Sequence, residues 1–133
     1  MNRYELISGK WTSDTGDVLG IGYSGGDCGL DPYAVNNPGF QSVHNVGPIP
    51  VGIYTINPPQ DTVTHGPFVL PLTPSPANLM WGRSGFLCHG DSVILPGKRA
   101  ASDGCIILPR NVRQQIWDSG DRDLQVVSEI GEQ

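Results

Sequence analysis

Apolar and polar residues alternate in short stretches along the chain, and clusters of glycine, proline, asparagine and serine separate these stretches. Residues 4–11 and 18–23 are predicted to be strands on either side of a turn at residues 13–17. In the second strand three apolar side chains alternate with two glycines, a period of two that is typical of one buried face. We therefore expect a hairpin at the beginning of the sequence.

Further strands are predicted where short apolar runs lie between turn residues. Residues 51–56 carry β-branched side chains at both odd and even positions, which predicts a strand that is buried on both faces. Residues 68–72, 86–89 and 124–130 are predicted to be further strands. Residues 24–50 are rich in turn signals, and a loop of this length is usually functional or ordered by its own packing.

The strongest helical pattern covers residues 108–119. Leu108, Val112 and Ile116 recur every four residues, Pro109 suits a first helical turn, and a glycine follows the last turn. Because 18 glycines and 12 prolines among 133 residues disfavour a helical bundle, the pattern as a whole predicts a mainly β fold. We expect two packed sheets with one or two short helices, in a single domain that spans all 133 residues.

Charge and composition exclude several classes of function. The net charge of -5 argues against a non-specific grip on nucleic-acid phosphates. No apolar run is long enough to span a bilayer, so we expect no membrane insertion. Residues 1–6 lack the apolar stretch of a secretory signal, so we expect synthesis in the cytoplasm and delivery by another route.

Two stretches, residues 85–92 and 101–107, carry the candidate chemistry. His89 ends one apolar strand, and sixteen residues later Cys105, preceded by Gly104, opens another apolar run. If these two strands are neighbours, the connecting loop brings the imidazole beside the thiol at one edge of a sheet. This arrangement is typical of nucleophilic catalysis by cysteine.

The surroundings of the thiol are expected to favour the thiolate. A partner histidine, nearby cations and a helix N-terminus each lower the pKa of a cysteine, and the sequence offers all three. The cations between residues 83 and 113 are Arg83, Lys98, Arg99, Arg110 and Arg113, against only two aspartates. Glycine at position 104 would let the amides of Gly104 and Cys105 converge on an oxyanion. The pattern predicts acyl transfer through a thioester.

Other interpretations of the same residues remain open. Cys105 could be a packed core residue, since free cysteine is among the most buried residue types. Metal binding through Cys88, His89 and Cys105 is disfavoured because adjacent residues of a strand point to opposite faces. We therefore expect neither a metal nor another cofactor.

The remaining cysteines and histidines are assigned to the scaffold. Three cysteines are too few for a disulfide framework. Cys28 and Cys88 could pair in an oxidising compartment, but free packed thiols are the default expectation for both. His44 and His65 lie in turn-rich segments and are expected to be surface residues. Tyr23 could line the cleft or pack in the core.

The stretch from His89 to Ser102-Asp103-Gly104-Cys105-Ile106 resembles the catalytic domain of L,D-transpeptidases, whose motif is a histidine, a spacer and Ser/Thr-His-Gly-Cys. More specifically, the chain resembles the small L,D-transpeptidase-like effectors of type VI secretion. The shared motifs, in order, are a hairpin with Trp11 and Thr15-Gly16, Tyr23-Ser24-Gly25, Asn36-Asn37-Pro38, Gly47 to Tyr54 and His89 to Ser92. The resemblance covers most of the chain.

This resemblance implies a role for each matched residue of the motif. Cys105 would be the nucleophile and His89 its general base. Gly104 and Cys105 would supply the oxyanion amides, and Ser102 would shape the loop. The carbonyl of Gly90, just after the histidine, would orient the imidazole.

Three further residues are candidates for contact with the substrate. Arg110 is a candidate clamp for a substrate carboxylate, and Tyr23 could line the cleft. Asp103 stands where the family has a second histidine. A carboxylate tends to raise the pKa of a neighbouring thiol. The replacement of this histidine by aspartate therefore bears on transpeptidation more than on acyl-enzyme formation.

The resemblance implies an L,D-carboxypeptidase or L,D-transpeptidase that acts on peptidoglycan stem tetrapeptides. It also implies an antibacterial toxin that works in the periplasm of a target cell, with secretion machinery and an immunity protein as partners. Two alternatives stay open. One is a phage or bacterial cell-wall amidase or endopeptidase with the same Cys–His pair, released in the phage case during lysis. The other is a non-enzymatic cell-wall binding module.

Overall fold

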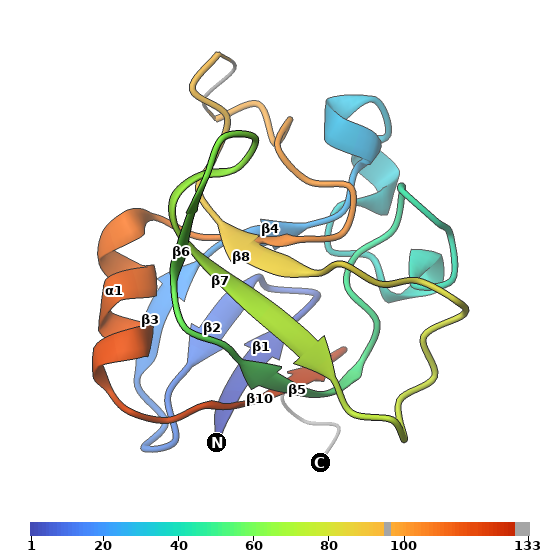
Figure 1. The fold of residues 1–133 in the computed structure, drawn as a ribbon. Coiled ribbons are helices and arrows are strands. Elements are labelled where there is room, and N and C mark those ends of the chain that lie inside the picture. Colours follow the sequence, from blue (N-terminus) through green and yellow to red (C-terminus); the bar gives the residue numbers. More distant parts are fainter. Residues whose placement is uncertain (95–96, 130–133) are drawn as a thin grey trace.

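The computed structural model of the protein describes residues 1–94 and 97–129 (Figure 1). Within these residues the fold is mainly β with one α-helix, α1 (Arg110–Asp118). The strands are β1 (Asn2–Glu5), β2 (Lys10–Thr12), β3 (Val18–Ile21), β4 (Tyr23–Ser24), β5 (Gly52–Ile56), β6 (Gln60–Thr62), β7 (Gly66–Pro74), β8 (Leu87–His89), β9 (Ile106–Ile107) and β10 (Asp123–Val127). The turn-rich stretch forms three short 3₁₀ helices, η1 (Asp27–Gly29), η2 (Pro32–Ala34) and η3 (Pro38–Phe40).

The strands follow one hydrogen-bonded path in the order β3-β2-β1-β10-β5-β7-β8-β9-β4, and β6 pairs with β7 outside this path. Only β1 with β10 and β8 with β9 are parallel among these pairs. The long strand β7 belongs to both halves of the path, because it pairs with β5 at Leu72–Pro74 and with β8 at Leu70 and Pro71. The path therefore consists of two sheets that meet at β7.

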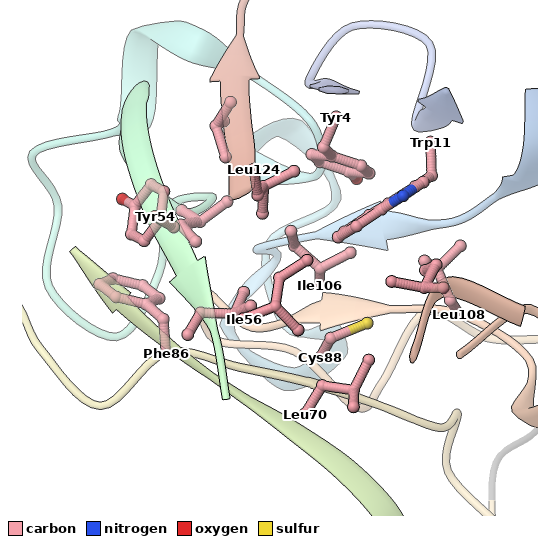
Figure 2. Close-up of a cluster of buried hydrophobic side chains, with 14 of the residues drawn as sticks. Tyr4, Trp11, Tyr54, Ile56, Leu70, Phe86, Cys88, Ile106, Leu108 and Leu124 are labelled. Atoms are coloured by element: carbon pink, nitrogen blue, oxygen red, sulfur yellow. The ribbon is translucent and has the colours of Figure 1, made fainter. Parts of the chain in front are cut away.

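The apolar faces of these two sheets enclose the main core (Figure 2). Its fully buried members from the two halves include Tyr4, Trp11, Leu124, Leu70, Cys88 and Ile106. Burying side chains of this size contributes about 1.5–3 kcal/mol each. Val112 and Ile116 of α1 join the same core, which explains the four-residue apolar period of the helix. The predicted mainly β fold with two packed sheets is confirmed.

Several predicted element boundaries differ from the structure. Residues 4–11 form two strands instead of one, because the chain turns back at Gly9, whose φ is +73°. The Gly9 carbonyl accepts a hydrogen bond from the Gly22 amide at 2.8 Å, and a Cβ on Gly9 would collide with the Gly22 carbonyl oxygen. Residues 18–23 are likewise divided into β3 and β4 around Gly22.

The prediction that residues 51–56 are buried on both faces is wrong. In β5, Tyr54 and Ile56 are buried, whereas Ile53 and Thr55 are exposed. The strand therefore has one core face and one open face. The helix is shorter than its predicted range by two residues at its start and one at its end, and the last predicted strand ends at Val127. Ile130, the last residue of that prediction, lies outside the described residues.

Within the described residues, no helix has both the length and the apolar character needed to cross a bilayer. The β6–β7 hairpin and the loop from β8 to β9 rise next to each other at one end of the molecule (Figure 1). The candidate site lies at this end.

Candidate active site

The pairing of β8 with β9 places the candidate nucleophile and base on one face of the sheet. Cys88 lies opposite Ile106, and His89 lies opposite Ile107. Cys88 and Ile106 point into the main core, whereas Cys105 and Ile107 pack in a separate cluster on the other face. Because successive strand residues alternate between faces, His89 and Cys105 share that second face as diagonal neighbours. The sequence prediction that these two strands are adjacent is confirmed.

Two cavities open at this face, and each contains one member of the pair. Cys105 lines the first cavity, of about 370 Å³. His89 and Arg113 line the second cavity, of about 550 Å³. His65 lines both, and its ring centroid lies 4.7 Å from that of His89. The two cavities therefore adjoin at His65, whose ring packs on the buried imidazole.

Ser102 fixes the loop that carries the thiol. Its fully buried hydroxyl donates to the Cys105 carbonyl at 2.6 Å. The same oxygen accepts hydrogen bonds from the Gly104 amide at 3.1 Å and from the Gly25 amide at 2.9 Å. Because the hydroxyl uses its one donor and both of its lone pairs, Ser102 connects residues 102–105 to the segment after β4. Ser102 is not among the described residues that line either cavity, so it acts on the loop alone.

The two amides that the sequence assigned to an oxyanion hole differ in their availability. Gly104 has a φ of +151°, and a Cβ there would lie 2.7 Å from Nη2 of Arg83, so only glycine fits. Its N–H already donates to Ser102. In the part of the chain that the structure describes, the Cys105 N–H has no acceptor. Of the two amides, the Cys105 N–H is therefore the one that has no acceptor to give up before it can bind an oxyanion.

The thiol is held in its neutral form. Burial raises the pKa of Cys105 to about 11, and Asp103 raises it further, while the Leu87 backbone amide bonded to the sulfur and the charge of Arg83 oppose the shift. The thiol is 7 % exposed. The expectation that the cationic surroundings lower this pKa is wrong, because desolvation outweighs them.

The imidazole of His89 has a defined tautomer. Its Nδ1 lies 2.9 Å from the Gly90 carbonyl oxygen, and a carbonyl can only accept, so Nδ1 carries the proton and Nε2 the lone pair. Burial lowers the pKa of His89, and the neighbouring charges of His65 and Arg113 lower it further. The ring is therefore neutral near pH 7 and able to accept a proton at Nε2.

Arg83 is a structural cation beside the thiol. It is 7 % exposed and lines the first cavity. Its two terminal nitrogens donate to four backbone carbonyls, those of Gln41, Gly47, Pro48 and Asp103. These bonds join the turn-rich segment to the loop that holds Gly104.

Two predicted substrate contacts are not brought to the cavities. The Arg110 guanidinium lies 5.3 Å from the ring centroid of Phe68, and Arg110 lines neither the first nor the second cavity. Tyr23 also lines neither of the two, and its hydroxyl donates to Asp91 at 2.7 Å while it accepts from the Ala101 amide at 3.1 Å. Asp103, by contrast, lines the first cavity together with Cys105.

Sequence reasoning missed the roles of His65 and Arg113 at the site. His44 and His65 are exposed, as predicted, yet both line the first cavity. No local sequence signal marks His65, since its position depends on the β6–β7 hairpin. For Arg113 the sequence does contain a signal, because this residue lies three positions before Ile116, at the edge of the buried stripe of the helix.

The other cysteines do not belong to the site. All three cysteines are free. Cys88 is a packed core thiol, as predicted, whereas Cys28 is exposed, so the prediction that it is packed is wrong. No group of three or more His, Cys, Asp or Glu side chains that could hold a metal ion occurs among residues 1–94 and 97–129.

Comparison with protein families gives one match. A family model described as the Tlde1 domain matches residues 21–129. This range contains every described residue that lines the two cavities. Comparison with curated proteins and with solved structures gives no match.

Proposed function

The chain belongs to the Tlde1 domain family, a family of type VI secretion effectors with L,D-transpeptidase character, and on that premise we propose that it is a cysteine-dependent peptidoglycan enzyme. Its substrate is the stem tetrapeptide, which it attacks at the carbonyl of the third residue. The observation that carries this proposal is that Cys105 and His89 share one face of the paired strands β8 and β9, with His89 Nδ1 bonded to the Gly90 carbonyl so that Nε2 carries the lone pair.

The first step forms a carbon–sulfur bond. Sγ of Cys105 attacks the carbonyl carbon while its proton passes to Nε2 of His89. The raised pKa of the thiol makes this transfer part of the attack, since little thiolate exists beforehand. The resulting oxyanion is stabilised by the Cys105 amide. The Gly90 carbonyl supports the imidazolium through its bond to Nδ1.

The second step breaks the peptide bond. The tetrahedral intermediate collapses, the amine of the terminal D-alanine takes the proton from Nε2 and leaves, and a thioester remains on Cys105. Water then attacks the thioester, gives one proton to His89 and restores the thiol, which completes an L,D-carboxypeptidase cycle. A D-amino acid or another stem peptide in place of water gives exchange or cross-linking.

The family also supports a proposal about where the enzyme works. An effector of type VI secretion is injected by the producing cell and acts on peptidoglycan in the periplasm of a target cell. The producing cell would then carry an immunity protein that binds the toxin. A cell-wall amidase or a non-catalytic binding module remains the alternative, and both are outcomes of the following experiment.

The test is incubation of the purified chain with tetrapeptide muropeptides. We expect release of D-alanine, with the rate lowered by about 10⁴-fold or more in Cys105→Ala and by about 10²–10⁴-fold in His89→Ala. Cys28→Ala is the matched control, because Cys28 is an exposed thiol outside both cavities, and it should keep the wild-type rate. Binding without turnover, or cleavage of another bond, would contradict the proposal.

A further inference from the structure

Arg113 is a buried cation with one unused edge. The residue is 4 % exposed, and its Nη1 donates to the Pro67 carbonyl at 3.0 Å and the Phe68 carbonyl at 2.8 Å. Nε is buried without any acceptor. Nη2 has no acceptor among the described residues and faces Gly90, where a Cβ would lie only 3.1 Å from it. The Nε–Nη2 edge of the guanidinium is therefore unpaired.

Within the described part of the chain, no carboxylate forms an ion pair with Arg113. The ion pair found there joins the amino group of Met1 to Asp121. Burying an unpaired charge is costly, and proteins normally pair such a group or satisfy all its donors. Arg83 follows that rule with four carbonyls, whereas Arg113 does not. A buried arginine with an unpaired edge, at the wall of a cavity, fits an anionic ligand that supplies the missing acceptors.

The geometry of the guanidinium defines the ligand class. Nε–H and Nη2–H are parallel donors that match the two oxygens of a carboxylate, which is the strongest form of this interaction. Arg113 lines the second cavity together with His89. Gly90 links the two, because its carbonyl accepts from the His89 ring while its Cα lies against Nη2 of Arg113.

This location selects one carboxylate of the substrate. In the proposed reaction His89 donates a proton to the amine that leaves, so the leaving residue must lie on the His89 side, in the second cavity. The carboxylate of a terminal amino acid is separated from its amine by a single Cα. Resting on the proposed function, we infer that Arg113 binds the free terminal carboxylate of the expelled residue, so that the second cavity is a subsite for a chain-terminal amino acid.

The subsite gives the enzyme an exo-acting specificity. A peptide that ends in the second cavity presents its carboxylate to Arg113, whereas a peptide that continues leaves the guanidinium unpaired. A free D-amino acid that enters as acceptor would place its own carboxylate at the same point. Arg110, three residues earlier on α1, does not line this cavity and takes no part.

The test compares three tetrapeptides: the free acid, the C-terminal amide, and a peptide amidated only at its side-chain carboxyl. We expect terminal amidation to lower kcat/KM of the wild type about tenfold or more, and side-chain amidation to have no such effect. Arg113→Gln should cleave the free acid and the terminal amide at similar rates. Arg113→Lys, which keeps the charge without the planar fork, should retain part of the preference, and Arg110→Gln all of it.

Three results would overturn the inference: equal cleavage of free acid and terminal amide by the wild type, an undiminished preference in Arg113→Gln, or sensitivity to the side-chain amide instead. Calorimetric binding to Cys105→Ala measures the same preference without turnover. A chain that binds the free acid more tightly through Arg113 yet cleaves nothing supports the subsite and contradicts the proposed function. Equal Kd values for the two peptides overturn the subsite whether or not cleavage occurs.

Discussion

Two buried arginines lie one in each of the two adjoining cavities, and they differ in how their donors are paired. Arg83 beside the thiol donates to four backbone carbonyls and is 7 % exposed. Arg113 beside the imidazole donates to two carbonyls from one nitrogen and is 4 % exposed. Burial and charge are common to both residues. What distinguishes Arg113 is that its Nε is buried without an acceptor, which is the observation behind the inferred carboxylate subsite.

The thiol and the imidazole, one in each cavity, respond to burial in the same sense. Burial raises the pKa of Cys105 in the first cavity and lowers that of His89 in the second. Both shifts favour the uncharged form, so desolvation dominates on both sides of the junction. The resting site is a neutral thiol and a neutral imidazole instead of a preformed ion pair.

We expect the greatest difference between the two arginines in how much each contributes to the free energy of unfolding. Arg83→Gln removes donors from buried carbonyls that hold the 41–48 segment, so the free energy of unfolding should fall by about 3 kcal/mol. Arg113→Gln frees fewer carbonyls and removes an uncompensated charge, so the loss should be about 1 kcal/mol or less. Urea denaturation of both variants measures the difference. Equal losses would show that Arg113 is as structural as Arg83.

The next expected effect is on the pH profile. His89 must be neutral to accept the thiol proton, and its pKa lies below the usual 6.5. Between the two shifted pKa values kcat/KM should therefore be flat, and below the pKa of His89 it should fall about tenfold per pH unit. No decline should occur from pH 7 to pH 9, since the thiol ionises only near pH 11. An acid limb centred above pH 7 would contradict the neutral-pair description.

Much of the geometry of the candidate site could be predicted from the sequence because its determinants are local. His89 closes a short apolar strand, and Ser102, Gly104 and Cys105 lie within four residues of one another, so their contacts follow from one tight loop. The hydrogen bond between the His89 ring and the Gly90 carbonyl joins adjacent residues. Local spacing and the resemblance to L,D-transpeptidases were enough to single out these positions.

The parts that could not be predicted depend on contacts between distant segments. His65 reaches His89 only because the β6–β7 hairpin rises beside β8. The pKa of Cys105 depends on its burial in a cluster with Tyr23 and Ile107, and Tyr23 comes from a distant part of the sequence. Similarly, the choice of Arg113 over Arg110 depends on which side of α1 faces the second cavity. These features require the folded arrangement.

The smallest expected effect concerns His65, the residue at the junction. Its ring packs at 53° to that of His89 with the centroids 4.7 Å apart, and such ring contacts contribute about 0.5–1.5 kcal/mol. His65→Ala should therefore lower kcat/KM by about 2- to 10-fold, and His65→Phe, which keeps a ring, should retain most of the activity. Steady-state kinetics on the free-acid tetrapeptide measures both. A loss in His65→Phe as large as that in His89→Ala would instead make His65 a proton-transfer residue.

In the proposed reaction Cys105 carries the acyl group as a thioester. The most direct measurement is rapid mixing with the tetrapeptide, an acid quench, and mass spectrometry of the intact and digested protein. We predict an adduct on the peptide that contains Cys105, with the mass of the substrate less one molecule of free alanine, and no adduct at Cys28 or Cys88. Continued release of D-alanine without any adduct at Cys105 would contradict the account.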